Sequence, residues 1–122
     1  VTGIEYNPEA IKFAQENAAF NHLRNTHFIQ GDVEKVLPRW LKTHQAGLII
    51  VNPPRQGLTK GVVQTLLKTQ AESLIYVSCM PATLARDLNV LCQNYQIQEG
   101  HVYDMFPQTA HVETLVYLKI KK

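Results

Sequence analysis

The sequence of 122 residues has little cysteine and no long hydrophobic run. Its two cysteines, Cys79 and Cys92, lack the paired spacing of a disulfide framework or a zinc site, so we expect no metal and a reducing, cytoplasmic setting. No stretch of 18 apolar residues and no signal-peptide pattern is present, so we expect neither a membrane span nor a membrane partner.

A strong excess of charge of one sign is also absent. The sequence has 12 Lys and Arg against 10 Asp and Glu, and this formal charge of +2 gives only weak support for a nucleic-acid partner. Hydrophobic residues make up 45% of the chain, which suits a packed core, but 122 residues are few for a complete α/β enzyme. Because the chain opens on Val1–Glu5, without Met and already within a predicted strand, we expect a fragment of a longer protein.

Periodic and alternating apolar residues predict an α/β fold. Strands are expected over Val1–Glu5, Thr26–Gln30, Gly47–Val51, Ser73–Ser78, Ile97–Tyr103 and Val112–Ile120. Helices are expected from Pro8 to near Asn21 and over Val33–Leu41, Lys60–Lys68 and Thr83–Cys92. This order predicts a mostly parallel sheet with helices on both faces and a final, hairpin-like pair of strands.

The stretch Ile75–Pro81 carries a thiol directly after a strand. Three apolar or β-favouring residues, Ile75–Val77, run into Ser78 and Cys79, and Pro81 stands where a helix could begin. Open α/β sheets bind their ligands at the carboxyl ends of the strands. We therefore interpret Cys79 as a nucleophile; the alternative is a buried free cysteine that packs as a small hydrophobe.

Three further strands end in polar residues, which would converge at one edge of a parallel sheet. Glu5 could accept two hydrogen bonds from a ribose diol, and Asp32 could accept one from an adenine amino group. A solvated loop acid and an ordinary Gly-Asp turn are the respective alternatives. Asn52 opens the segment Asn52-Pro53-Pro54-Arg55, whose two prolines would hold the amide in a fixed direction at the mouth of a pocket.

The segment Asp104–Glu113 combines an aromatic residue, a proline and titratable groups just before the last predicted strand. Glu113 lies where the chain re-enters the sheet, which makes it a candidate general base. The alternative is that His111 and Glu113 are polar residues at a strand edge.

Four motifs, in the same order and spacing, resemble the RNA uracil-5-methyltransferase family. They are Gly3-Ile4-Glu5, Asn52-Pro53-Pro54-Arg55-Gln56-Gly57, Ser78-Cys79-Met80-Pro81 and Asp104-Met105-Phe106-Pro107 with His111-Val112-Glu113. Asparagine at Asn52, where aspartate is the other family form, resembles the branch that acts on 23S rRNA. Met80 departs from the family's usual asparagine but leaves the thiol in place.

The resemblance implies a Rossmann-like, class I fold dependent on S-adenosylmethionine (SAM), truncated at its N-terminus, with its first strand and glycine-rich loop missing. It implies methylation of C5 of a uridine in RNA, with 23S rRNA favoured and tRNA as the alternative. Cys79 would attack C6 of uracil and Glu113 would remove the C5 proton. Glu5, Asp32 and Asn52 would bind SAM, and the iron–sulfur cluster of some members would belong to the missing N-terminal part.

Residues 1–122 would then be the C-terminal portion of a catalytic domain, inactive in isolation. The missing first strand would lie between Val1–Glu5 and Gly47–Val51, so both would have unpaired backbone groups on one side. Either they pair directly, or another copy fills the gap, or the residues are a piece of a longer ordered chain that supplies the strand. We also expect that the fragment can self-associate through exposed sheet edges.

Two functions of other kinds stay open. Methylation of an amino group in nucleic acid is one, because Asn-Pro-Pro followed by an aromatic residue holds an exocyclic amine in several methyltransferases. Arg55 stands here in the aromatic position, and Cys79 would have no role in that reaction. A non-catalytic interaction domain is the other, and it predicts no consequence from the loss of Cys79.

Overall fold

The computed structural model describes residues 1–122, which divide into two compact units, Val1–Thr43 and His44–Lys122. All ten predicted helices and strands are present in the predicted order. No helix combines the length and the apolar character that a membrane crossing requires.

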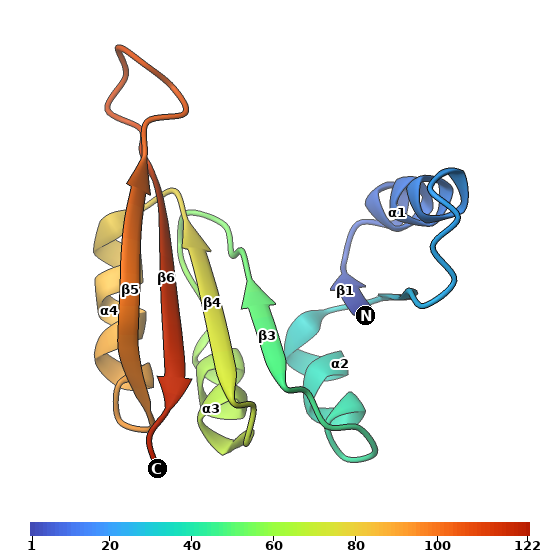
Figure 1. Cartoon of the computed structure of the whole chain (residues 1–122), viewed down its shortest axis with the longest axis horizontal. Helices are drawn as coiled ribbons and strands as arrows, with labels where there is room; N and C mark the ends of the chain where they lie inside the picture. The colour runs from blue at the N-terminus through green and yellow to red at the C-terminus, as the bar shows by residue number, and fades with distance from the viewer. The chain divides into compact units, whose positions relative to one another are not determined.

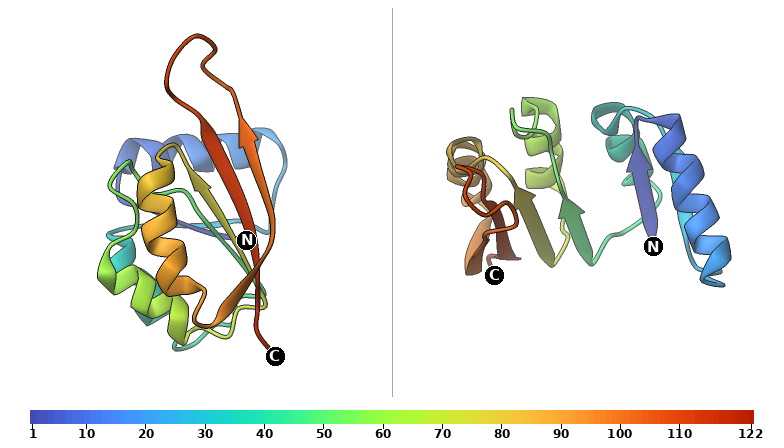
Figure 2. Two further views of the ribbon diagram at one scale, coloured as in Figure 1. Left: turned by 90° about the vertical axis from the view of Figure 1, so that its left-hand side faces the viewer. Right: turned by 90° about the horizontal axis from the view of Figure 1, so that it is seen from above.

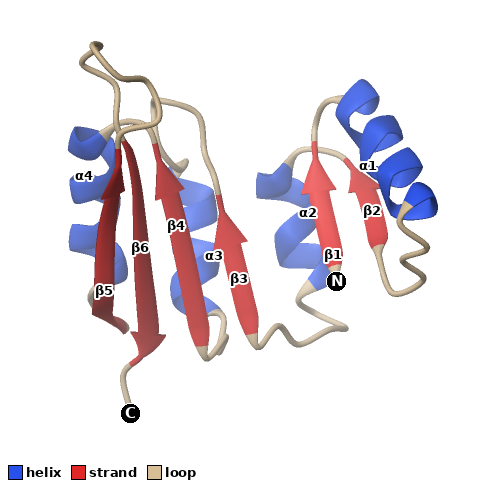
Figure 3. Ribbon diagram, turned by 45° about the horizontal axis from the view of Figure 1, so that its top comes forward, coloured by secondary structure: helices blue, strands red, loops and turns tan.

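The first unit contains β1 (Thr2–Glu5), α1 (Pro8–Phe20), β2 (His27–Gln30) and α2 (Val33–Trp40). β1 and β2 pair in parallel, with Glu5 opposite Gln30. As predicted, Asn7 caps α1, because its Oδ1 accepts a hydrogen bond from the Glu9 N–H at 2.9 Å. α1 and α2 lie on opposite faces of this strand pair (Figure 3).

The second unit contains β3 (Leu48–Val51), α3 (Lys60–Lys68), β4 (Ser73–Ser78), α4 (Pro81–Leu91), β5 (Tyr95–Tyr103) and β6 (Glu113–Ile120). Its strands form one sheet in the order β3-β4-β6-β5 (Figure 1). β3 and β4 are parallel, and β6 is antiparallel to both β4 and β5. The prediction of a mostly parallel sheet with an antiparallel C-terminal strand is confirmed for this unit.

Two boundaries in the second unit differ from the prediction. α4 begins at Pro81 instead of Thr83, because the fixed φ of proline suits the first position of a helix. β5 begins at Tyr95 instead of Ile97. Tyr95 is fully buried and its hydroxyl donates to the Ala71 carbonyl at 3.2 Å, which holds the start of the strand against the core.

α3 and α4 cover the same face of the four-stranded sheet (Figure 2). The crossovers β3–α3–β4 and β4–α4–β5 both advance in one direction across the sheet, and right-handed crossovers then place both helices on one side. Leu74, Tyr76 and Leu118 point to this side and are fully buried. Helices thus lie on both faces of the β1–β2 pair, whereas within the second unit both helices cover one face.

β1 hydrogen-bonds only to β2, and β3 hydrogen-bonds only to β4. Each of the two strands expected to flank a missing strand is thus an edge strand of its own unit and lacks a partner on one side. Leu48 and Ile50 of β3 are 49% and 62% exposed. Self-association through these edges stays a prediction.

Candidate active site

Cys79 and Glu113 are brought together by the pairing of β4 with β6. The antiparallel register ends with Ser78 opposite Thr114, so Cys79, directly after β4, and Glu113, the first residue of β6, lie at the same end of this pair. Both residues are half-buried at the same edge of the sheet. The predicted nucleophile and base are therefore neighbours, although 33 intervening residues separate them in the sequence.

Ser78 shapes the backbone around the thiol. This residue is buried, and its hydroxyl accepts a hydrogen bond from the Met80 N–H at 3.0 Å and lies 3.1 Å from the Met80 carbonyl, to which it donates. The chain therefore turns tightly at Cys79 before α4 begins. This turn fixes the position of the thiol relative to the helix.

The predicted residue Asn52 follows β3 at the same edge of the sheet. Because Val51 is opposite Tyr76 in the parallel β3–β4 pair, Asn52 lies beside the end of β4 that leads to Cys79. Asn52 is exposed. The second unit thus brings Asn52, Cys79 and Glu113 to one edge.

Arg55 and His111 connect two loops at this edge. Nη2 of Arg55 lies 3.1 Å from Nδ1 and 3.2 Å from Nε2 of the His111 ring, and both side chains are exposed. The contact joins the loop after β3 to the segment before β6. The sequence motifs contain both residues but gave no reason to expect that they touch.

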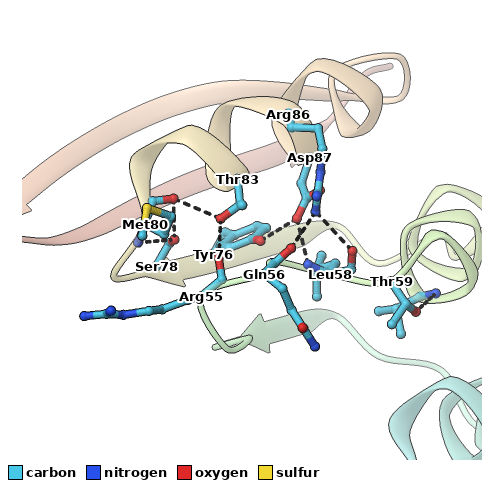
Figure 4. A network of polar contacts seen from close by, with 11 residues as sticks. Arg55, Gln56, Leu58, Thr59, Tyr76, Ser78, Met80, Thr83, Arg86 and Asp87 are labelled. Atoms are coloured by element: carbon cyan, nitrogen blue, oxygen red, sulfur yellow. Dashed lines mark hydrogen bonds and ion pairs between the residues drawn. The ribbon is translucent and has the colours of Figure 1, made fainter.

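The loop after β3 is held by α4 through its backbone (Figure 4). The Thr83 hydroxyl donates to the Arg55 carbonyl at 2.9 Å. Nη2 of Arg86 donates to the Gln56 carbonyl at 2.9 Å and to the Leu58 carbonyl at 3.3 Å. Three carbonyl groups of a surface loop are therefore paired with side chains of one helix.

Asp87 completes this set of contacts from a buried position. The residue is only 3% exposed, and its Oδ2 accepts hydrogen bonds from the Leu58 N–H at 2.8 Å and from the Tyr76 hydroxyl at 2.6 Å. Its Oδ1 accepts from Nε and Nη2 of Arg86 at 2.9 and 2.8 Å. Burial, and next the hydrogen bond to Asp87, raise the pKa of Tyr76 well above its usual range, so this hydroxyl stays a donor.

Position 57 of this loop accepts only glycine. Its φ is +78°, and a Cβ built there would lie 2.6 Å from Nη2 of Arg86 and 2.6 Å from Oδ2 of Asp87. The N–H of Gly57 also closes a turn by donating to the Pro54 carbonyl at 2.8 Å. The tight turn and the close approach of α4 both need the absent side chain.

We expect Gly57→Ala to lower the free energy of unfolding by about 2 kcal/mol or more, because it adds left-handed backbone strain to a steric clash. Chemical denaturation measures this change. Gly100→Ala is the matched control, because no atom lies within 4 Å of the place that its added methyl group would occupy and its φ is not in the left-handed region. The control should change the free energy by less than about 0.5 kcal/mol. Equal effects of the two substitutions would contradict the packing described here.

Glu5 and Asp32 lie at the carboxyl ends of the strands of the first unit. The Gly31 N–H donates to the Glu5 carbonyl at 2.9 Å, which keeps the two strand ends side by side. Oε1 of Glu5 accepts from the Asn7 N–H at 2.7 Å, and Oδ1 of Asp32 accepts from the Glu34 N–H at 2.9 Å. Asp32 is thus the N-cap of α2, and each carboxylate has one oxygen outside these local contacts.

Sequence reasoning missed Thr83, Arg86 and Asp87. One signal was present: Asp87 falls between Leu84 and Leu91 on the apolar stripe of α4, three and four residues from them, so a carboxylate occupies a core position. Its partners could not be read from the pattern, because Leu58 lies 29 residues away in the chain.

The model of the tRNA (uracil-5-)-methyltransferase family matches residues 1–121. The chain belongs to this family. It is 59% identical over 121 residues to an uncharacterised RNA methyltransferase of Protochlamydia amoebophila, with 98% of this chain and 28% of the relative covered. An uncharacterised RNA methyltransferase of Listeria monocytogenes is 46% identical over 122 residues, with 99% and 27% covered. The chain thus spans little more than a quarter of the length of these curated relatives.

A solved structure of a tRNA uracil-5-methyltransferase has the same fold. Pyrococcus abyssi tRNA (uracil-54, C5)-methyltransferase, in complex with S-adenosyl-L-homocysteine, matches with a TM-score of 0.84 and 34% identity over 97% of this chain and 28% of that chain. The N-methyltransferase NodS of Bradyrhizobium japonicum, with 17% identity and a TM-score of 0.75 over 99% of this chain and 66% of that one, shows the fold alone. These likenesses confirm the predicted class I fold of SAM-dependent methyltransferases.

Proposed function

We propose that residues 1–122 act as the C-terminal portion of a catalytic domain that methylates C5 of a uridine in RNA, with SAM as methyl donor. The observation that carries this proposal is that Cys79, directly after β4, and Glu113, the first residue of β6, lie at the same end of the β4–β6 pair. A thiol and a carboxylate at the carboxyl edge of the sheet can act as nucleophile and proton acceptor on the same uracil ring. The family match over residues 1–121 supports the same reading.

The reaction needs both groups because C5 of uracil is a weak nucleophile. The Cys79 sulfur attacks C6 of a flipped-out uracil. The π electron pair of the C5–C6 double bond then shifts toward the C4 carbonyl, which gives an enolate. C5 then has the electron density to take the methyl group. Glu113 afterwards removes the proton from C5, which restores the C5–C6 bond as the Cys79 sulfur leaves.

SAM supplies an electrophilic methyl group when it is bound. The donor set of the chain fits a nucleoside: Glu5 is exposed and has one oxygen outside its contact with Asn7, so it can accept from a ribose hydroxyl. Asp32 can accept from an adenine amino group with the oxygen that does not cap α2. Asn52 would orient the methyl donor against the uracil from the edge that carries Cys79.

For the RNA, we propose a uridine of 23S rRNA, on the basis of Asn52 before Pro53-Pro54-Arg55. A tRNA uridine is the second candidate, because the structural neighbour at 34% identity is a tRNA (uracil-54, C5)-methyltransferase. An iron–sulfur cluster needs about four thiolate ligands, and the two cysteines of this chain are too few to hold one, so any cluster would be bound elsewhere in the protein.

The decisive experiment uses RNA that carries tritium at C5 of its uridines. Methylation at C5 must displace that hydrogen, so the complete protein, incubated with SAM, should release tritium into water in step with methyl incorporation. Transcripts of 23S rRNA and of tRNA distinguish the two substrates. Methyl incorporation without tritium release would mean methylation at a position other than C5 of uridine, such as an amino group, and would overturn the proposal, as would no incorporation into either RNA.

A further inference from the structure

We propose that Thr83, Arg86 and Asp87 of α4 form a positioning clamp for the reaction. Through them, α4 would hold Asn52 and Arg55 at a fixed distance from the thiol of Cys79. This inference rests on the function proposed above. It assigns to α4 a positioning role in the reaction, in addition to its place directly after the nucleophile in the chain.

The helix is anchored to both parts of the site. On one side, the turn made by Ser78 and Met80 joins its first residue, Pro81, to Cys79. On the other side, its side chains bind the carbonyls of Arg55, Gln56 and Leu58 and the N–H of Leu58. One helix therefore connects the turn of Ser78 and Met80, which flanks the thiol, with the loop after β3 (Figure 4).

The clamp holds a surface loop at a high cost in desolvation free energy. Water would satisfy exposed loop carbonyls at little cost, whereas a carboxylate taken out of water loses several kcal/mol of hydration that its partners must replace. Asp87 occupies a position on the helix where a leucine would pack with Leu84 and Leu91. If stability alone mattered, an apolar residue would be favoured at this position. The buried carboxylate therefore indicates that the conformation of the loop after β3 has to be fixed.

Loop geometry matters because Asn52 and Arg55 have few other restraints. Asn52 is exposed, and Arg55 contacts only the exposed ring of His111 and, through its carbonyl, Thr83. A displacement of about 1 Å in a group that orients reactants costs on the order of 100-fold in rate. Weakening the clamp should therefore slow the reaction more than it weakens the binding of RNA.

The test compares matched substitutions in the complete protein. Thr83→Val removes the hydroxyl bond to the loop, and its control, Thr65→Val, removes a hydroxyl bond of 2.9 Å to the Gly61 carbonyl within α3. Tyr76→Phe removes one partner of Asp87, and its control, Tyr95→Phe, removes an equally buried tyrosine bond far from the loop. Each pair makes the same substitution at a hydroxyl that donates within the core or to a carbonyl. Thr83→Val also removes a 3.1 Å contact with the Met80 carbonyl, and Tyr76 donates to a carboxylate whereas Tyr95 donates to a backbone carbonyl.

We expect kcat for Thr83→Val and Tyr76→Phe to fall at least about tenfold, with KM for RNA within about threefold of the unmodified protein. The controls should keep kcat within about twofold, although their melting temperatures fall by a similar amount. Hydrogen exchange at the Leu58 amide should accelerate in Tyr76→Phe and not in Tyr95→Phe.

If both members of a pair lose activity equally, in proportion to stability, the clamp is only structural and the inference is overturned. It is overturned as well if Thr83→Val and Tyr76→Phe keep full kcat. Failure of the proposed function itself would look different, because the unmodified protein would then show no tritium release at all.

Discussion

Replacing Cys79 with alanine is expected to lower uridine methylation by the complete protein on the order of 1,000-fold or more, because the reaction loses its nucleophile. Without a sulfur to add to C6, C5 keeps too little electron density to accept the methyl group. The thiol acts on the uracil ring, so the affinity for SAM should stay within about threefold. Tritium release measures the first quantity, and calorimetry with SAM measures the second.

Cys92→Ala provides the matched control for this experiment. Cys92 is the other free cysteine, is half-buried like Cys79, and lies at the opposite end of α4, where it forms the C-cap. Its loss should leave the methylation rate within about twofold. Residual turnover of Cys79→Ala within about tenfold of the unmodified protein would show that Cys79 is not the nucleophile, and it would favour a non-catalytic role for this thiol.

The order and type of all helices and strands were predictable because the local patterns are strong. Apolar runs such as Gly47–Val51 end abruptly at Asn52 and Pro53, and the proline pair cannot continue a ladder. Asn7 with Pro8 begins α1 where the capping rule places it. Patterns of this kind depend on neighbouring residues, so they can be read without knowledge of the rest of the chain.

The placement of helices on one face of the second sheet was not predictable from these patterns. It follows from the strand order β3-β4-β6-β5, which is a property of long-range pairing. The register that brings Cys79 and Glu113 to the same end of β4 and β6 is likewise a long-range property. Sequence analysis placed each residue at a strand end but could not give the partner strand.

The clamp lay beyond sequence reasoning for a related reason. A buried aspartate is tolerated only with partners, and the partners of Asp87 come from three different elements: the Leu58 amide, the Tyr76 hydroxyl and the Arg86 guanidinium. Only Arg86 is a sequence neighbour. A carboxylate within the apolar stripe of a helix signals that such partners exist, but it does not say where they lie.

Replacing Glu113 with glutamine is expected to trap a covalent complex between the protein and its RNA. Glutamine has nearly the same size as glutamate and stays in place at the start of β6, but its amide does not take up a proton. Cys79 can still attack C6, and C5 can still accept the methyl group. The C5 proton then has no acceptor, so the sulfur does not leave and turnover falls on the order of 100-fold or more.

The trapped complex should be visible as a band of reduced mobility on a denaturing gel, labelled by methyl-tritiated SAM. Glu99→Gln is the matched control, because Glu99 is an exposed acid of the neighbouring strand β5 whose contact is with His101. That variant should turn over normally and leave no band. Cys79→Ala combined with Glu113→Gln should abolish the band, because the bond to RNA is made by the Cys79 sulfur. A Glu113→Gln protein that is inactive and forms no adduct would show that Glu113 acts before methyl transfer, and proton removal from C5 would then have to be assigned to another group.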